Sequence, residues 1–136
     1  MTVDAVVADA NVLLSAAVGR AARRVFSRSS TAVHTTRFNA DAVEQHLPKL
    51  TAMYGLADEL VQIQWRILRL DIHPEEDYAA FLAKARKDLQ KRDPDDANPL
   101  ALARFLSIPL WSNDRDLTGH GEEIYSTVRL LKELNV

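Results

Sequence analysis

The stretch Val6-Val7-Ala8-Asp9-Ala10-Asn11, near the N-terminus, determines the fold class expected for this chain. A short, wholly apolar run is typical of a strand buried on both faces, as in the centre of a parallel sheet. An acid follows this run directly, and a helix-forming stretch through Ala17 comes next, which Asn11 is expected to cap. A buried strand that leads at once into a helix indicates an α/β protein.

Strands and helices continue to alternate along the chain. Further strands are predicted at residues 32–35, 70–73, 110–112 and 124–126, beside a first strand at 3–8. Helices are predicted at residues 11–17, 20–28, 39–54, 56–69, 75–90 and 127–134, with another that has Pro99 in its first turn. Asn39 is expected to cap the helix that ends before Gly55. The pattern predicts a three-layer α/β/α fold with a four- to five-stranded, mainly parallel sheet.

Length and composition indicate one compact domain over residues 1–136. Hydrophobic residues make up 47% and charged residues 26%, which is ordinary for a soluble protein. The absence of cysteine excludes disulfides and thiolate metal sites and suits a reducing cytoplasm. No secretory signal and no membrane-spanning apolar run is apparent, so we expect a cytoplasmic protein that does not enter a membrane.

Acidic residues stand where such a sheet would gather them. Asp9 ends the first predicted strand, Asp114 follows the fourth, and Asp96 precedes an Ala/Leu-rich helix. Glu44 lies on the predicted helix 39–54. Functional groups of open parallel sheets collect beyond the carboxyl ends of the strands. We therefore expect these four carboxylates to form one acidic pocket.

A pocket of this kind favours a bound cation. Two negative charges about 5 Å apart repel by roughly 3 kcal/mol at an effective dielectric constant of about 20. Four clustered carboxylates would cost on the order of 10 kcal/mol, close to the roughly 5–15 kcal/mol stability of a whole domain. Oxygen ligands select hard ions such as Mg²⁺ or Mn²⁺, and the four histidines show no zinc-site spacing. The pattern indicates metal-dependent phosphodiester hydrolysis, in which ions bind Asp9, Asp96 and Asp114 and activate water.

The charge distribution adds a second indication. The net charge is −2, yet the segment from Ala10 to Ala40 has no acid and a charge of +5. Such a cluster could attract a nucleic-acid backbone, or it could be an ordinary solvated surface. The candidates for contact with an RNA backbone are Arg20, Arg23, Arg24 and Arg37.

In their order along the chain, these motifs resemble the PIN-domain nucleases, a family that includes the VapC-type toxins of bacterial toxin–antitoxin pairs. The motifs are Asp9-Ala10-Asn11, the helical acid Glu44, Asp96-Ala97 before Leu100-Ala101-Leu102-Ala103, and Trp111-Ser112-Asn113-Asp114-Arg115-Asp116-Leu117. The resemblance spans nearly the whole chain. It implies a PIN-like fold and a Mg²⁺- or Mn²⁺-dependent endoribonuclease that cleaves single-stranded RNA. It also implies a homodimer and, for a toxin, an antitoxin partner.

The resemblance assigns roles to individual acids. Asp9 matches the first acid of the family, Asp96 the third and Asp114 the fourth, while Asp116 matches a further metal-binding acid of many members. Glu44 has the position of the second acid, on the helix after the second strand. Competing acids for that position are Asp41, Asp58 and Glu59.

Small polar residues accompany the acids. Asn11 stands where a polar side chain would hold a carboxylate or a water, and Ser112 and Asn113 are expected to support Asp114 in the same way. The chain departs from the common family pattern at Asn98-Pro99 and at Ser107, where the helix often lacks proline and ends in glycine. These differences affect helix ends and leave the acids in place.

Other classes of protein are also considered. The turn after the first strand has no glycine, which disfavours a dinucleotide-binding domain and a P-loop. A phosphatase with an aspartyl nucleophile usually has a second Asp two residues after the first, where this chain has Asn11. That reading is less favoured but stays open, as does a PIN-like protein that binds RNA or another partner without catalysis.

Overall fold

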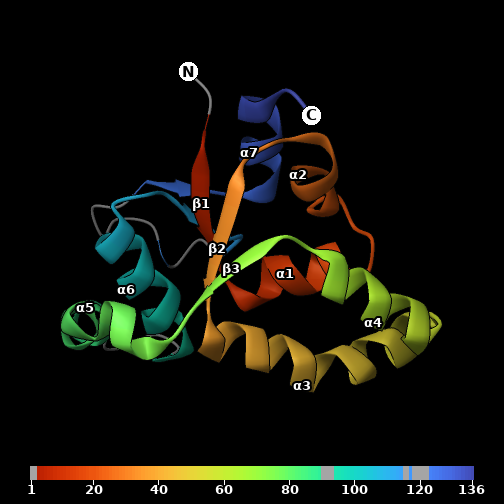
Figure 1. Ribbon diagram of the computed structural model, residues 1–136, viewed down its shortest axis with the longest axis horizontal. Coiled ribbons are helices and arrows are strands. Elements are labelled where there is room, and N and C mark those ends of the chain that lie inside the picture. The colour runs from red at the N-terminus through yellow and green to blue at the C-terminus, as the bar shows by residue number, and fades with distance from the viewer. Residues whose placement is uncertain (1–2, 90–93, 115–116, 118–122) are drawn as a thin grey trace.

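The computed structural model describes residues 3–89, 94–114, 117 and 123–136, and its centre is a parallel sheet (Figure 1). The five strands are β1 (Ala5–Ala8), β2 (Ala32–Thr36), β3 (Leu70–His73), β4 (Leu110–Trp111) and β5 (Ile124–Tyr125). Their order is β3-β2-β1-β4-β5, and all neighbours run parallel. The first strand is therefore central, as its apolar sequence predicts.

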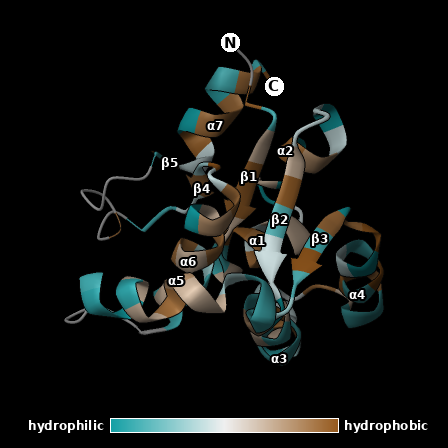
Figure 2. Cartoon of the chain, turned by 60° about the vertical axis from the view of Figure 1, so that its left-hand side comes forward, coloured by the Kyte–Doolittle hydropathy of each residue, from teal (hydrophilic) through white to brown (hydrophobic). Residues whose placement is uncertain are grey.

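Helices cover both faces of the sheet. They are α1 (Ala10–Ala17), α2 (Arg23–Arg28), α3 (Arg37–Tyr54), α4 (Asp58–Ile67), α5 (Glu75–Asp88), α6 (Ala97–Leu106) and α7 (Thr127–Leu134), with a 3₁₀ turn η1 (Pro94–Asp96) before α6. Figure 2 shows α5 and α6 on one side of the strands, away from α3 and α4. This arrangement confirms the predicted three-layer α/β/α fold with a parallel sheet.

The alternation of side chains along β1 divides the core into two halves. Val6 and Ala8 are fully buried against apolar side chains of α1, α2, α3, α4 and α7. Val7 points the other way and packs with α5 and α6. Each such valine contributes roughly 1.5–3 kcal/mol by leaving water, so β1 holds the two helical layers together and fixes the position of its carboxyl end.

Two capping residues differ from those predicted, and both lie at this end of the sheet. Asp9, not Asn11, caps α1, because its carboxylate accepts a hydrogen bond from the Val12 N–H at 3.0 Å. Thr36, not Asn39, caps α3, since its hydroxyl oxygen accepts from the Asn39 N–H at 2.9 Å. In both cases the strand passes into the helix with no intervening loop, so the cap is the last extended residue.

The end of α3 is as predicted, because Gly55 follows the helix with a φ of 64°. Pro99 lies in the first turn of α6, where its missing N–H costs no helical hydrogen bond. Ser107 takes the left-handed conformation that ends α6, with a φ of 56°. Of the helices in the described parts of the chain, none has both the length and the apolar character needed to cross a membrane.

Candidate active site

A polar pocket of about 200 Å³ opens at the carboxyl edge of the sheet, where α1, α3 and η1 meet. Its described lining contains three carboxylates and neither lysine nor arginine. The lining residues are Asp9, Ala10, Asn11, Leu14, Phe38, Asn39, Ala42, His46, Asp95 and Asp96. The strand-end rule used on the sequence therefore brings Asp9 and Asp96 to one pocket, with Asn11 beside them.

Asp9 is the most constrained of these acids. The residue is only 5% exposed, and it directly follows β1 and caps α1. Burial raises the pKa of the Asp9 carboxyl above its ordinary value of 3.8, and the nearby Asp114 carboxylate raises it further. Hydrogen bonds from the Ser112 hydroxyl and from the Val12 and Asn11 N–H groups act in the opposite direction. Because burial is the largest of these effects, the negative charge of Asp9 is costly where it stands.

Ser112 joins the acid of β1 to the acid that follows β4. Its hydroxyl hydrogen-bonds the Asp9 carboxylate and accepts from the Asp114 N–H at 3.0 Å. Ser112 is itself buried, and the pairing of Ala8 with Trp111 places the two strand ends side by side. The predicted supporting role of Ser112 therefore has a geometric basis.

Asn113 supports a different part of the structure. Its side-chain oxygen accepts from the Thr127 N–H at 2.8 Å, at the start of α7. Trp111 is fully buried, and its indole N–H donates to the Thr127 hydroxyl at 3.0 Å. These two contacts fix the end of β4 against α7, and Trp111 is a core residue.

Asp95 and Asp96 come from η1, directly before α6. Asp96 is half-buried and occupies the N-cap position of α6, and Asp95 is exposed. The sequence pattern identified Asp96 as a site residue and gave Asp95 no role of its own. The structure places both in the lining of the pocket.

The side chains of this lining that can bind a metal are three carboxylates, the amides of Asn11 and Asn39 and the imidazole of His46. Carboxylate and amide oxygens are the ligands that suit Mg²⁺ or Mn²⁺. Among the residues that the structure describes, no group of three or more histidine and acidic side chains is arranged to hold a metal ion by itself. Asp116, a predicted ligand, lies outside the described residues. Mg²⁺ usually keeps several waters and binds through one or two carboxylates together with substrate phosphates. Two carboxylates of this lining would supply the kind of ligands that such an ion takes, with water or substrate as further ligands.

Glu44 is on α3, as predicted, but it does not line the pocket. Its carboxylate accepts from the Trp65 indole N–H at 3.4 Å, on the side of α3 that meets α4. The residue of α3 that faces the pocket near this position is Ala42. Two residues differ by about 200° around a helix, so Ala42 and Glu44 lie on opposite sides of the buried stripe that contains Val43.

Most of the candidate arginines lie away from the pocket. Arg20 donates to the Tyr54 hydroxyl at 3.1 Å and stacks over its ring, at the far end of α3. Arg24 donates to the backbone carbonyl of Val136 at 3.3 Å, and Arg23 begins α2 beside it. Arg37 alone among the four adjoins a lining residue, because it precedes Phe38 in the first turn of α3.

Three lining residues were not predicted as site residues. Phe38 and His46 share one face of α3 with Ala42, at intervals of four residues, and Asn39 is buried with its side chain bound to Thr36. The four-residue spacing is visible in the sequence. It becomes informative only when the core face of α3 is known, since that face decides which residues turn toward the pocket.

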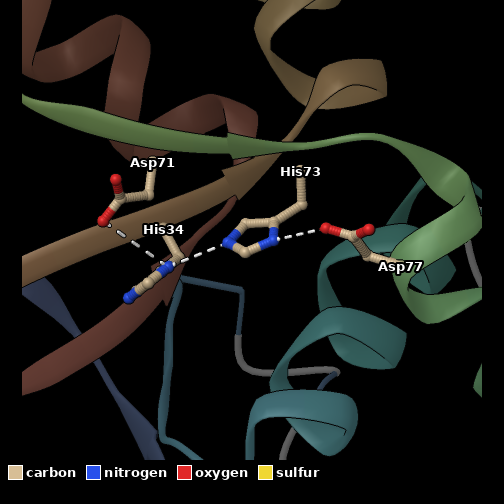
Figure 3. Close-up of polar contacts among 4 residues, drawn as sticks. All are labelled: His34, Asp71, His73 and Asp77. Carbon is tan, nitrogen blue, oxygen red and sulfur yellow. Dashed lines mark hydrogen bonds and ion pairs between the residues drawn. The ribbon is translucent and has the colours of Figure 1, made fainter.

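A second polar cluster lies at the β2–β3 side of the sheet (Figure 3). Nδ1 of His34 and Nε2 of His73 are 2.9 Å apart, and Nδ1 of His73 is 2.9 Å from the Asp77 carboxylate. Asp71 lies 3.8 Å from Nδ1 of His34. When both rings are neutral, this order fits a chain in which His34 donates to His73 and His73 donates to Asp77. Burial lowers the pKa of His34, the Asp71 charge raises it, and His73 lowers it.

Fold and pocket together define a small α/β domain with carboxylates collected at the carboxyl edge of a parallel sheet. A family model described as the PIN domain matches residues 7–135. The chain therefore belongs to the PIN domain family.

Solved structures share the fold at low sequence identity. A chain of a toxin–antitoxin complex from Klebsiella pneumoniae is 16% identical, with a TM-score of 0.63; the match covers 90% of this chain and 97% of that one. VapC20 of Mycobacterium tuberculosis, described as a toxin that cleaves the sarcin–ricin loop, is 17% identical, with a TM-score of 0.59 and coverage of 86% and 95%. No curated protein sequence matches this chain significantly.

Proposed function

We propose that this PIN domain is a metal-dependent endoribonuclease that hydrolyses phosphodiester bonds of single-stranded RNA. The observation that carries the proposal is the buried Asp9 carboxylate, which shares a pocket with Asp95 and Asp96 and is bridged by Ser112 to Asp114. Its raised pKa shows that burial opposes the negative charge, and a divalent cation would offset that cost. The similarity to VapC20, which is described as a toxin that cleaves the sarcin–ricin loop, supports RNA as the substrate.

In the proposed site, Asp9 and Asp96 would hold Mg²⁺ or Mn²⁺, with Asp114 and the predicted ligand Asp116 completing the acidic set. When bound, such an ion polarises the phosphate and lowers the pKa of a water molecule. The role of Ser112 is to orient Asp9. A carboxylate of the set orients or deprotonates the attacking water.

The direct test is cleavage of a labelled single-stranded RNA with Mg²⁺ or Mn²⁺, and again with EDTA. Asp9→Asn should lower the rate by about 100-fold or more, because it replaces a charged ligand with a neutral one of the same shape. Asp4→Asn is the matched control: Asp4 is exposed and stands at the amino end of the same strand. Equal cleavage by wild type and Asp9→Asn would remove Asp9 from the site, and cleavage unaffected by EDTA would remove the metal.

The same assay separates the alternatives. RNA that is bound but never cut, with either ion, would indicate an interaction protein without catalysis. Release of inorganic phosphate from a phosphomonoester without chain cleavage would indicate a phosphatase. In both cases the pocket would remain the candidate binding site, and the proposed reaction would be wrong.

We further propose that the chain is the toxin of a toxin–antitoxin pair, acting in the cytoplasm as a homodimer. The Klebsiella pneumoniae structure is described as a toxin–antitoxin complex, which supports an antitoxin partner. One face of α4 exposes Leu60, Ile63 and Ile67, at helical spacing, and this apolar stripe is a candidate surface for a protein partner. Light scattering of the purified chain, with and without a co-expressed antitoxin, would test both partners. A strictly monomeric chain would contradict the dimer.

A further inference from the structure

One face of α3 forms a wall of the acidic pocket without contributing to the core. The buried residues of the helix are Asn39, Ala40, Val43, Leu47 and Thr51. Another set of residues, four apart, lines the pocket instead, namely Phe38, Ala42 and His46.

Phe38 is the aromatic residue of α3 that lies in the lining of the acidic pocket. It is 43% exposed, and it belongs to the lining that contains Asp9. A single exposed ring is common on protein surfaces, so its place in the pocket lining is what indicates a ligand; a ligand that covered the ring would gain by removing its apolar surface from water. The next turn presents only the methyl group of Ala42, so a small side chain lies between the rings of Phe38 and His46. The Cα atoms of Phe38 and His46 are about 12 Å apart along the helix axis, at 1.5 Å per residue.

The dimensions and charge of the site indicate what covers this ring. A pocket of about 200 Å³ is smaller than the roughly 300 Å³ or more of pockets for drug-sized ligands. Arg37 is exposed and precedes Phe38 in the first turn of α3, so a cation and the positive end of the helix dipole lie at the same end of the helix as this ring, and both favour a phosphate. An aromatic ring next to positive groups is a common arrangement for binding single-stranded nucleic acid, in which bases stack on rings and the backbone meets cations.

We infer that the Phe38–Ala42–His46 face is a nucleobase-binding wall. The base next to the phosphate at the acidic residues stacks on the ring of Phe38, and His46 provides a second planar ring. This inference rests on the proposed ribonuclease function and adds the part of the substrate that the pocket recognises. Because every base has a flat face, stacking alone holds single strands with little preference for sequence.

The test is RNA binding, measured by fluorescence anisotropy in an Asp9→Asn background so that the RNA stays intact. Phe38→Leu should weaken binding of a single-stranded RNA by about 5- to 150-fold, the equivalent of one lost base–aromatic stack. Phe38→Trp should restore binding, since it keeps a ring, and His46→Ala should weaken it to a smaller extent. Phe105→Leu is the matched control, because Phe105 is also 43% exposed, lies on α6 and is absent from this pocket's lining.

An abasic oligonucleotide of the same length separates stacking from general attraction to the backbone. Phe38→Leu should leave binding of the abasic strand unchanged. Equal weakening for both strands, or no weakening for the RNA, would overturn the inference while the cleavage assay still reports on the proposed function. Failure of the Asp9→Asn parent to bind RNA at all would overturn the inference as well. If wild type nevertheless cleaves RNA, only the stacking wall is wrong.

Discussion

The Asp9 pocket and the His34–His73 cluster both gather titratable side chains near the sheet, but they differ in how charge is balanced. In the cluster, each ring has a partner at 2.9 Å, and the chain of contacts ends on the Asp77 carboxylate. In the pocket, burial is the largest effect on the pKa of Asp9, and the like charge of the Asp114 carboxylate acts in the same direction. The histidine rings of the cluster bind each other and a carboxylate, whereas Asp9 is a buried acid whose negative charge a bound cation would stabilise.

The largest expected difference is in catalysis. His34→Gln and His73→Gln should keep RNA cleavage within about 3-fold of wild type, because neither side chain lines the pocket. Asp96→Asn and Asp114→Asn should lower the rate by about 100-fold, as expected for Asp9→Asn. Steady-state cleavage rates of purified variants with matched melting temperatures would measure this. A large loss of activity in either histidine variant would show that the two regions act together.

A second prediction concerns Glu44 and tests the angular position of residues on α3. Glu44→Gln should keep cleavage within about 3-fold of wild type, because the side chain is directed toward Trp65. Ala42→Leu, which fills space in the pocket, should reduce RNA binding by about 10-fold or more at unchanged stability. The two variants differ by two positions in one helix, so each serves as a control for the other. A Glu44→Gln variant as inactive as Asp9→Asn would restore Glu44 to the catalytic set.

A smaller effect is expected on the stability of the metal-free protein. Asp9→Asn should raise the melting temperature at neutral pH by about 3 °C, or about 1 kcal/mol, because it removes a buried charge and keeps an oxygen that can cap α1. The folded state holds the Asp9 proton more tightly than the unfolded state. Its contribution to stability is therefore full below pH 3.8 and is lost as the pH rises through the folded pKa. Melting in EDTA from pH 4 to 8 would measure this, and a lower melting temperature for Asp9→Asn at pH 7 would contradict it.

The smallest expected effect is the pH response of the histidine cluster. The pKa of His34 is lowered mainly by burial, so the unfolded state takes up a proton more readily than the folded state. Its contribution to stability is full above pH 6.5 and is lost as the pH falls through the folded pKa. Urea midpoints of wild type should decrease between pH 7.5 and 5.5 by more than those of His34→Gln. Identical slopes would show that His34 is not the group responsible.

The same comparison explains what the sequence could predict. The strand-end rule predicted that Asp9, Asp96 and Asp114 lie at one edge of the sheet, because a buried parallel strand fixes the edge at which its last residue lies. Asp9 and Asp96 share the pocket lining, and Asp114 is outside that lining but is joined to Asp9 through Ser112. The layers of the fold could also be predicted, because apolar runs and the residues that begin and end helices are signals local in the sequence. The chain's membership of the PIN domain family confirms the resemblance found in its motifs.

The features that the sequence did not determine depend on how a helix is rotated about its axis and on contacts between residues far apart in the sequence. Whether Glu44 or Ala42 faces the pocket depends on which stripe of α3 is buried, and that is decided by packing against α1 and α4. The partners of His34 and His73 come from strand pairing and from the first turn of α5, so spacing alone gave no reason to join them. The arginine segment is continuous in sequence, but its members diverge, because Arg24 meets the C-terminus and Arg20 meets Tyr54.

The central claim is that the Asp9 pocket takes a divalent cation, and thermal unfolding with and without Mn²⁺ tests it most directly. A ligand at 100 times its dissociation constant stabilises the folded state by about 2.7 kcal/mol, so wild type should melt several degrees higher in Mn²⁺ than in EDTA. His34→Gln should show the same increase, and Asp9→Asn should show little or none. An increase in Asp9→Asn as large as that of wild type, or no increase in wild type, would contradict the account.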